Sequence, residues 1–202
     1  MNTKLKDTIE NLNIDSISND RKELLLSFSK LLQNKRDEDK TINLNFICTH
    51  NSRRSHLSQI WMQTLSSFFN LREIFCYSGG TESTAVASPI IETLEKQGFD
   101  VQTISNGNNP IHAIKFDSNS APVIGFSKEY FSDFNPKSNF IAVMTCSQAD
   151  EGCPLVLGAD ARIPLTFEDP KAFDNTPIQN QKYLERSTQI AAELYYVLSQ
   201  LN

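Results

Sequence analysis

One stretch of the chain combines residue types that could attack and hold a tetrahedral oxyanion. It reads Cys48-Thr-His-Asn-Ser-Arg-Arg-Ser55, so five residues separate the cysteine from Arg54. A thiolate is a strong nucleophile, and a guanidinium can bind two oxygens of one anion through parallel hydrogen bonds. Ser55 could hydrogen-bond the thiolate, or it could simply cap a helix. The pattern predicts that Cys48 attacks a phosphate-like group whose oxygens Arg54 binds.

The residues on either side of this stretch predict the elements that position it. Apolar residues alternate before it, as in a strand, at Ile42, Leu44 and Phe46. After it they recur every three or four residues, as in a helix, at Leu57, Ile60, Trp61, Leu65 and Phe68. A loop that joins a strand to a helix directs backbone amides and the positive end of the helix at one point, which suits an anion. A buried, unreactive cysteine is the alternative, but it leaves the two arginines without a role.

Three further reactive residues follow later in the chain. A buried-strand pattern over residues 140–146 ends at Cys146, Cys153 lies seven residues further on, and Asp169 precedes Pro170. A carboxylic acid that faces Cys48 could protonate a leaving oxygen, although Asp-Pro is also a common turn pair. The sequence therefore makes Asp169 the candidate general acid.

Residues 48–55 resemble the catalytic loop of the low-molecular-weight protein tyrosine phosphatase superfamily, which includes the thioredoxin-coupled arsenate reductases. The order of Cys146, Cys153 and the Asp-Pro pair is similar to the arsenate reductase branch, and the resemblance covers about residues 42–200. It implies that Cys48 attacks arsenate and that Cys146 then attacks Cys48, releasing arsenite. Cys153 would next attack Cys146 and pass the disulfide to thioredoxin. If residues 146–153 were helical, this segment would have to loop out for that step.

The resemblance also implies an oxyanion-binding loop made of Thr49, His50, Asn51, Ser52, Arg53, Arg54 and Ser55. Asn51 matches a family asparagine that braces the loop, although it could be a plain turn residue. His50 stands where a small residue, commonly glycine, is usual in the family. Histidine tolerates a left-handed backbone, but the bulk of its side chain could narrow the entrance to the oxyanion site. Arg53 replaces a second cysteine of many members and either adds a cation beside the thiolate or points into solvent.

Three functions remain open at this stage. The first is an arsenate reductase with residual phosphatase activity, and the second is a phosphatase for phosphotyrosine or small aryl phosphates, with Cys146 and Cys153 as redox protection. Phosphotyrosine enzymes often have tyrosines beside the acid, whereas here Tyr183 is the first one after Pro170 and falls in a predicted helix. That spacing favours the reductase. The third is a non-catalytic oxyanion or redox sensor whose N-terminal helix contacts a partner.

Alternating strand and helix patterns predict an α/β fold, an open parallel sheet with helices on both faces. Strands are expected at residues 42–47, 72–78, 101–104, within 111–131 and at 140–145, and helices from residues 57, 88 and 176. The catalytic domain is predicted to span residues 41–202. Residues 1–40 are predicted to form a helical extension with one helix capped by Asn19 or Asp20. Its apolar face would be covered by the catalytic domain or by a second copy of the chain, a homodimer.

Composition excludes several classes of partner. With 202 residues, a net charge of −5 and a pI near 5.2, no nucleic-acid surface is expected. The polar N-terminus and the absence of an apolar run near 18 residues predict no membrane segment and a cytoplasmic protein whose thiols stay reduced. Four cysteines and three histidines match no common zinc pattern, so no metal or other cofactor is predicted.

Overall fold

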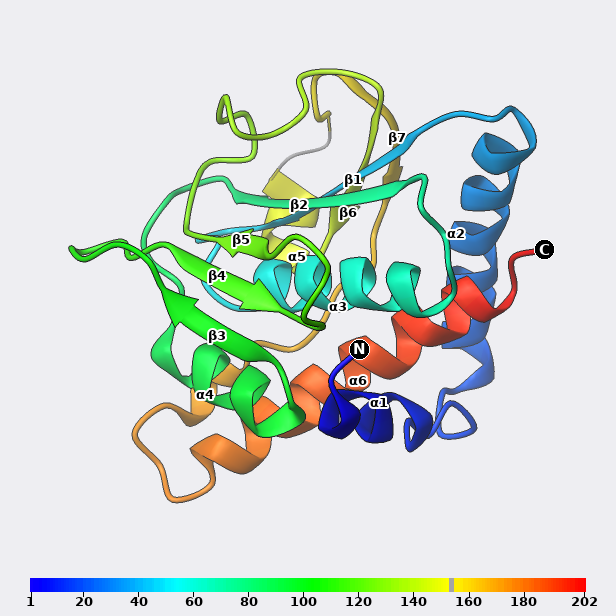
Figure 1. The fold of residues 1–202 in the computed structure, drawn as a ribbon. Helices are drawn as coiled ribbons and strands as arrows, with labels where there is room; N and C mark the ends of the chain where they lie inside the picture. Colours follow the sequence, from blue (N-terminus) through cyan, green and yellow to red (C-terminus); the bar gives the residue numbers. More distant parts are fainter. Residues whose placement is uncertain (153–154) are drawn as a thin grey trace.

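The protein is described by a computed structural model that covers residues 1–152 and 155–202. Its centre is a four-stranded sheet in the order β2-β1-β6-β7, in which all three pairings are parallel (Figure 1). The strands are β1 (Ile42–Cys48), β2 (Ile74–Gly80), β6 (Phe140–Met144) and β7 (Ala159–Ile163). This architecture confirms the predicted α/β fold with a parallel sheet.

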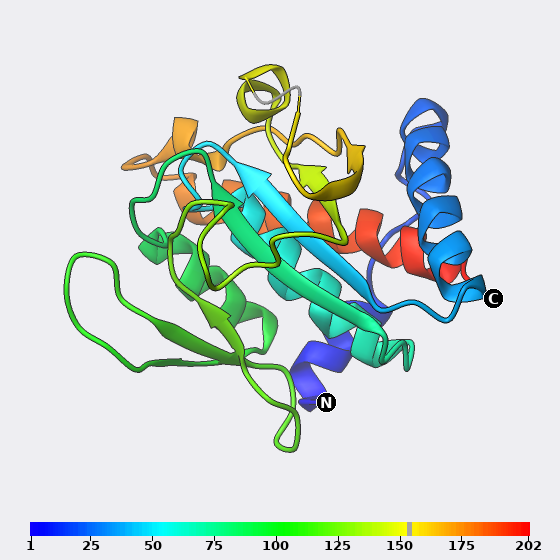
Figure 2. The same ribbon diagram turned by 90° about the horizontal axis from the view of Figure 1, so that it is seen from above.

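The two central strands of the sheet, β1 and β6, are buried on both faces, as their apolar sequences require. Every residue of β6 is buried, and its side chains alternate between two apolar clusters. Ile141 and Val143 join the main core with α3 (Arg54–Phe68) and α6 (Gln179–Ser199), which lie together behind the sheet in Figure 2. On the other face, Phe140 and its alternate neighbours pack with α5 (Ser147–Gly152).

A second, three-stranded sheet was not foreseen from the sequence. It contains β3 (Asp100–Thr103), β4 (His112–Lys115) and β5 (Val123–Gly125), and both pairings are antiparallel. The strands expected at 101–104 and within 111–131 therefore exist but do not join the parallel sheet. The connections between them hold no crossover helix, and parallel pairing needs a long crossover.

The helices that precede and follow this small sheet begin and end at recognisable residues. α4 (Ser88–Gln97) has Pro89 in its first turn and ends at Gly98, whose φ of 102° is left-handed. The final helix α6 was expected from residue 176 but begins at Gln179. The Gln179 side chain instead accepts a hydrogen bond from the Asn175 amide, 2.8 Å.

The N-terminal residues form two helices, α1 (Thr3–Glu10) and α2 (Asn19–Asp37), where the sequence predicted one. Ser18 caps α2 by accepting from the Arg21 amide, in place of the predicted Asn19 or Asp20. The buried side chains of both helices, among them Leu25 and Phe28, belong to the same apolar core as the sheet and α6. The apolar face of α2 is thus covered by the chain itself, which removes the reason for expecting a homodimer there.

Arg21 anchors α2 to the rest of the molecule. Its Nε donates to Glu193 Oε2 of α6 at 2.8 Å, and its Nη2 donates to the Thr166 carbonyl at 2.9 Å. The guanidinium also lies 5.1 Å from the centre of the Phe167 ring. In the part of the chain that the structure describes, no helix is both long and apolar enough to cross a membrane.

Removal of the Arg21 side chain should destabilise the protein far more than removal of an exposed cation from the same helix. In Arg21→Ala the buried Glu193 carboxylate loses its cationic partner and keeps only the Gln189 amide, so we expect the free energy of unfolding to fall by about 2 kcal/mol. Lys30→Ala is the matched control, because Lys30 is exposed on α2. Urea unfolding measures both; equal midpoints would contradict the anchoring role.

Candidate active site

The cysteine loop (residues 48–55) joins the end of β1 to the start of α3, as the sequence predicted. Cys48 is buried, and its Sγ lies 3.1 Å from Ser55 Oγ. The Asn51 side-chain amide donates to the same Ser55 oxygen at 2.9 Å, which leaves the Ser55 hydroxyl hydrogen free to point at the sulfur. The structure therefore places Ser55 against Cys48, not at the helix cap.

Four successive carbonyl groups of the cysteine loop, those of residues 49–52, are bonded to groups outside it. Those of Thr49, His50, Asn51 and Ser52 accept from Glu82 N (2.9 Å), Ser127 Oγ (2.9 Å), His56 Nε2 (2.9 Å) and Ala87 N (3.1 Å). The N–H and C=O groups of a trans peptide point in opposite directions. With the carbonyl oxygens turned outward, the amides are left to face the centre of the loop, where an oxyanion would bind.

The left-handed residue of the loop is Asn51, with φ of 44°, and not His50, whose histidine was expected to tolerate that conformation. Asparagine adopts it more readily than most residues. Both polar atoms of the Asn51 side chain are hydrogen-bonded: Nδ2 donates to Ser55 Oγ, and Oδ1 accepts from the Lys128 backbone amide at 2.9 Å. The His50 imidazole, by contrast, is part-exposed, with Nδ1 3.2 Å from Glu82 Oε2.

His56 is a site residue that the sequence analysis missed. It is fully buried, Nε2 meets the Asn51 carbonyl, and Nδ1 lies 3.3 Å from Ser78 Oγ. A carbonyl can only accept, so Nε2 carries the hydrogen and Nδ1 accepts from Ser78. Burial, helped by the positive charge of Lys128, lowers the pKa of His56 to about 3. A neutral imidazole therefore supports the cysteine loop from the protein interior. No residue spacing in the sequence indicates this role for His56.

Gly80 lets β2 approach the loop closely enough for these contacts. A Cβ at Gly80 would lie 2.6 Å from the Thr49 carbonyl oxygen and 2.7 Å from the Asn51 amide nitrogen. Any other residue would therefore push β2 and the cysteine loop apart. Gly80 thus has a steric role at the site.

Arg54 is buried and connects the cysteine loop to the candidate acid. Its Nη1 donates to the Phe167 carbonyl at 3.0 Å, and its Nη2 meets Asp169 Oδ2 at 2.6 Å. Asp169 Oδ1 accepts from the Lys171 amide, 3.0 Å, and so caps the short 3-10 helix η1 (Pro170–Phe173). The fold thus brings Asp169 to the loop.

Arg53 is neither a solvated side chain nor an unpaired cation. Its Nε donates to the Tyr183 hydroxyl at 2.6 Å and its Nη2 meets Asp174 Oδ2 at 2.8 Å. Burial opposes its charge, but the hydrogen bond to Tyr183 and the nearby carboxylates outweigh burial and raise the pKa of Arg53. Burial and the Asp174 hydrogen bond raise the pKa of Tyr183 to about 12, so its hydroxyl stays protonated.

Cys146 lies beside the cysteine loop. It follows β6, whose register with β1 pairs Ile47 with Met144, so Cys48 and Cys146 lie at the same edge of the sheet. Cys146 Sγ is buried 3.5 Å from Thr49 Oγ1 and accepts from the Ala149 amide at 3.3 Å. The α5 helix then occupies residues 147–152. Cys153, the third cysteine of the predicted disulfide relay, lies outside the described residues.

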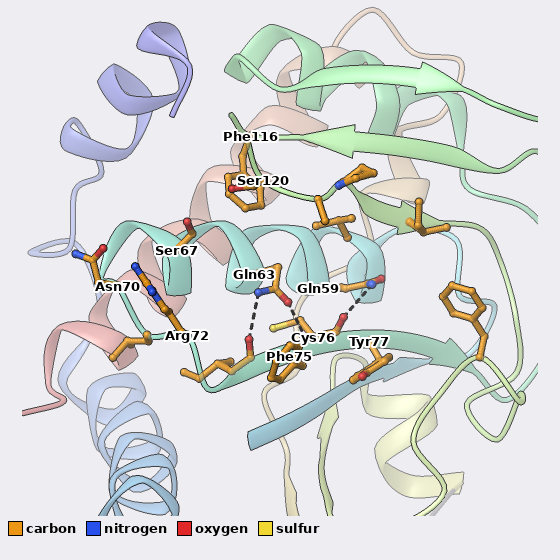
Figure 3. Close-up of a pocket in the computed structure, with 17 residues that line it drawn as sticks. Gln59, Gln63, Ser67, Asn70, Arg72, Phe75, Cys76, Tyr77, Phe116 and Ser120 are labelled. Atoms are coloured by element: carbon orange, nitrogen blue, oxygen red, sulfur yellow. Dashed lines mark hydrogen bonds between the residues drawn. The ribbon is translucent and has the colours of Figure 1, made fainter. Parts of the chain in front are cut away.

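A hollow of about 630 Å³ lies elsewhere, between β2, α3 and the segment that contains β5 (Figure 3). There Gln59 and Gln63 of α3 hydrogen-bond the outer edge of β2 at Cys76 and Ile74, 3.0 to 3.1 Å. No residue of the cysteine loop lines it. Within residues 1–152 and 155–202, no group of three or more His, Cys, Asp or Glu side chains could hold a metal ion.

Comparisons with known proteins agree with this geometry. No family model matches the chain. Arsenate reductase 2 of Staphylococcus epidermidis is 26% identical over 125 residues, 62% of this chain and 76% of that protein. A low-molecular-weight phosphotyrosine phosphatase from Vibrio cholerae superposes with a TM-score of 0.52 at 11% identity, over 78% of this chain and 95% of that one. An arsenate reductase in its phosphate-binding state superposes with a TM-score of 0.50 at 17% identity, over 80% of this chain and 99% of that one.

The structural matches show that the chain has the low-molecular-weight phosphatase fold. Together with the arsenate reductase relatives, they support membership of the low-molecular-weight protein tyrosine phosphatase superfamily. They support an enzyme of the arsenate reductase or the phosphatase type.

The buried His56 should make stability fall in mild acid. The folded protein binds no proton at His56 until about pH 3, whereas the unfolded chain binds one below about pH 6.5. The contribution of neutral His56 is therefore complete above pH 6.5 and is lost as the pH falls, by about 1.4 kcal/mol per pH unit between pH 6 and 4.5. In His56→Gln, urea unfolding at several pH values should show a slope smaller by this amount. An unchanged slope would contradict a buried neutral imidazole.

Proposed function

We propose that this chain is an arsenate reductase that passes oxidation from Cys48 to Cys146 and Cys153, with phosphatase-type chemistry in the same loop. The observation that carries the proposal is the buried Cys146 thiol beside the cysteine loop, at the carboxyl end of the strand next to β1. Neighbouring strands lie about 4.8 Å apart, and a disulfide spans Cα separations up to about 7 Å. A phosphatase has no chemical need for a second thiol there.

In the first step, the Cys48 thiolate attacks arsenate and forms a sulfur–arsenic bond as an oxygen leaves. The loop amides and Arg54 hold the remaining oxygens, and Arg54 Nε has no partner among the described residues, so it can donate to one. Asp169 supplies the proton that lets the oxygen depart as water. To do so it must first give up its 2.6 Å ion pair with Arg54, whose nitrogen the substrate can take over.

In the second step, the Cys146 thiolate attacks Cys48 Sγ. A disulfide forms, the sulfur–arsenic bond breaks, and its electron pair goes to arsenic, which leaves as arsenite. The two sulfurs together lose two electrons, and arsenic gains them. The hydrogen bond from the Ala149 amide to Cys146 Sγ supports this role, because an ionised sulfur accepts hydrogen bonds more strongly than a thiol.

The third step would move the disulfide to Cys146 and Cys153 and then to thioredoxin in a reducing cytoplasm. A helix covers residues 147–152, and seven residues of helix would separate two Cα atoms by about 10 Å. Disulfide formation within about 7 Å therefore requires α5 to unwind. Only Ala149 of this short helix is buried. The polar contacts of α5 are those of Asp150 with Arg162, 2.6 Å, and of Gln148 with Thr49, 3.4 Å, so few interactions oppose unwinding.

A phosphatase without redox function is the second candidate, because the cysteine loop and Asp169 suffice for ester hydrolysis. One observation speaks against a phosphotyrosine substrate. Tyr183, the first tyrosine after Pro170, is fully buried and bonded to Arg53, so it cannot form a wall beside a substrate ring.

Replacement of Cys146 should separate the two candidate functions. Cys146→Ser should leave aryl phosphate hydrolysis within about twofold of the wild type, since that reaction needs no second thiol, but it should stop arsenite release, with arsenic held on Cys48. Cys153→Ser should release one arsenite per chain and retain a Cys48–Cys146 disulfide. Cys76→Ala is the control, because Cys76 lies buried in β2 and should affect neither reaction.

The measurement is arsenite release with thioredoxin, thioredoxin reductase and a nicotinamide donor, followed by mass spectrometry of alkylated, non-reduced peptides. If arsenate produces no disulfide that involves residue 146 or 153 while aryl phosphate is hydrolysed, the phosphatase function replaces the reductase. If the wild type turns over neither substrate, a non-catalytic oxyanion or redox sensor remains.

Replacement of Asp169 should reveal whether it donates a proton. Asp169→Asn should slow hydrolysis of aryl phosphates with poor leaving groups by about a hundredfold and those with good leaving groups by less than about fivefold, because only a poor leaving oxygen needs protonation. The kcat/KM values across a series of substituted aryl phosphates measure this. Equal slowing across the series would mean that Asp169 has a structural role.

A further inference from the structure

Arg53, Tyr183 and Asp174 form a closed network of three hydrogen bonds. Arg53 Nε donates to the Tyr183 hydroxyl at 2.6 Å, Arg53 Nη2 meets Asp174 Oδ2 at 2.8 Å, and the Tyr183 hydroxyl donates to Asp174 Oδ1 at 2.6 Å. The three residues come from the cysteine loop, from α6 and from the end of the Asp169 segment (residues 166–174). The network therefore joins the cysteine loop to two neighbouring segments that follow it by 121 and 130 residues.

The burial of this network makes it a firm connection. The Arg53 and Asp174 side chains are 14% and 26% exposed, and Tyr183 is fully buried. Hydrogen bonds between charged groups gain strength as water is excluded, and removal of one partner leaves the other charge unpaired. Surface ion pairs are worth little by comparison, so this pair is of the kind that can hold a loop.

Two side-chain ion pairs attach the Asp169 segment to the cysteine loop, beside the hydrogen bond from Arg54 Nη1 to the Phe167 carbonyl. Asp169, just before η1, is bonded to Arg54, and Asp174, just after η1, is bonded to Arg53. The first contact uses an arginine that must bind the substrate oxyanion, so it is lost when substrate arrives. The second contact uses no group that the substrate needs, and it remains.

We propose that Arg53 is a positioning residue, which holds the Asp169 segment against the cysteine loop through Asp174 and Tyr183 while Arg54 binds the oxyanion. This inference rests on the proposed function, in which Asp169 protonates a leaving oxygen. The four-residue η1 between Asp169 and Asp174 is short, so a fixed Asp174 restricts where the Asp169 carboxyl can move. Asp174 already compensates the charge of Arg53, so the role does not depend on Arg53 stabilising the Cys48 thiolate.

Two conservative variants test this role. Arg53→Lys keeps the charge but cannot make both bonds, and Tyr183→Phe keeps the ring but removes the shared hydroxyl. Each should reduce kcat/KM by about tenfold for aryl phosphates with poor leaving groups and by less than about twofold for those with good ones. The double variant should lose no more than the worse single variant, because both changes break one network. Arg72→Lys, at an exposed arginine, is the matched control.

Two further measurements separate positioning from other roles. The pH dependence of Cys48 alkylation should match the wild type in both variants; a midpoint shifted upward would show that Arg53 stabilises the thiolate and would overturn the proposal. Amide hydrogen exchange of residues 171–175 should become faster in both variants, a readout that requires no turnover. Unchanged exchange, or equal slowing for good and poor leaving groups, would also overturn it.

The exchange measurement distinguishes this inference from the proposed function. If the wild type converts neither arsenate nor aryl phosphate, the proposed function fails, and Arg53 then has no role in protonating a leaving group. Faster exchange in both variants would still show that the network holds the Asp169 segment. If the wild type is active while exchange and leaving-group dependence are unchanged in both variants, the positioning role alone fails.

Discussion

The backbone bend at Asn51 is the constraint on which the site depends. A left-handed φ costs an ordinary residue about 1–2 kcal/mol, and here it turns the loop so that its carbonyls point outward and its amides inward. Four outside groups bind those carbonyls, and the Asn51 side chain bonds both Ser55 and the Lys128 backbone. Because the donors are fixed before substrate arrives, they need not reorganise when charge develops on an oxyanion.

This arrangement requires buried polar groups on the interior side of the cysteine loop. His56, Ser78 and Asn51 are buried, and their mutual bonds satisfy the loop without any charge on the imidazole. Lys128 lies in the same interior against the Phe126 ring, 4.5 Å from its centre, and burial lowers the pKa of its ammonium to about 8. A network of this kind is costly if one bond is lost, so it fixes a single loop conformation.

The segment that bears Asp169 is held from three sides. Arg21 of the N-terminal extension bonds its first residue, Thr166, and Arg53 bonds its last, Asp174. Between them the Phe167 amide donates to the Thr145 carbonyl at the end of β6, next to Cys146. The extension thus contributes to the placement of the candidate acid, although it lies outside the region that resembles the superfamily. Asp169, Cys48 and Cys146 all lie at the carboxyl edge of the parallel sheet, where open α/β sheets bind ligands.

The sequence by itself determined the features that depend on short spacing. Strand, loop and helix around Cys48 follow from local apolar periodicity, and the ends of α4 follow from Pro89 and Gly98, because these signals act within a few residues. Tertiary structure alone decided which distant groups meet. Asp169 lies 115 residues from Arg54, and the partners of Arg53 lie 121 and 130 residues away, so no local pattern encodes these contacts. The antiparallel sheet and the burial of α2 against α6 were likewise set by long-range packing, which periodicity cannot reveal because it shows that a face is buried but not by what.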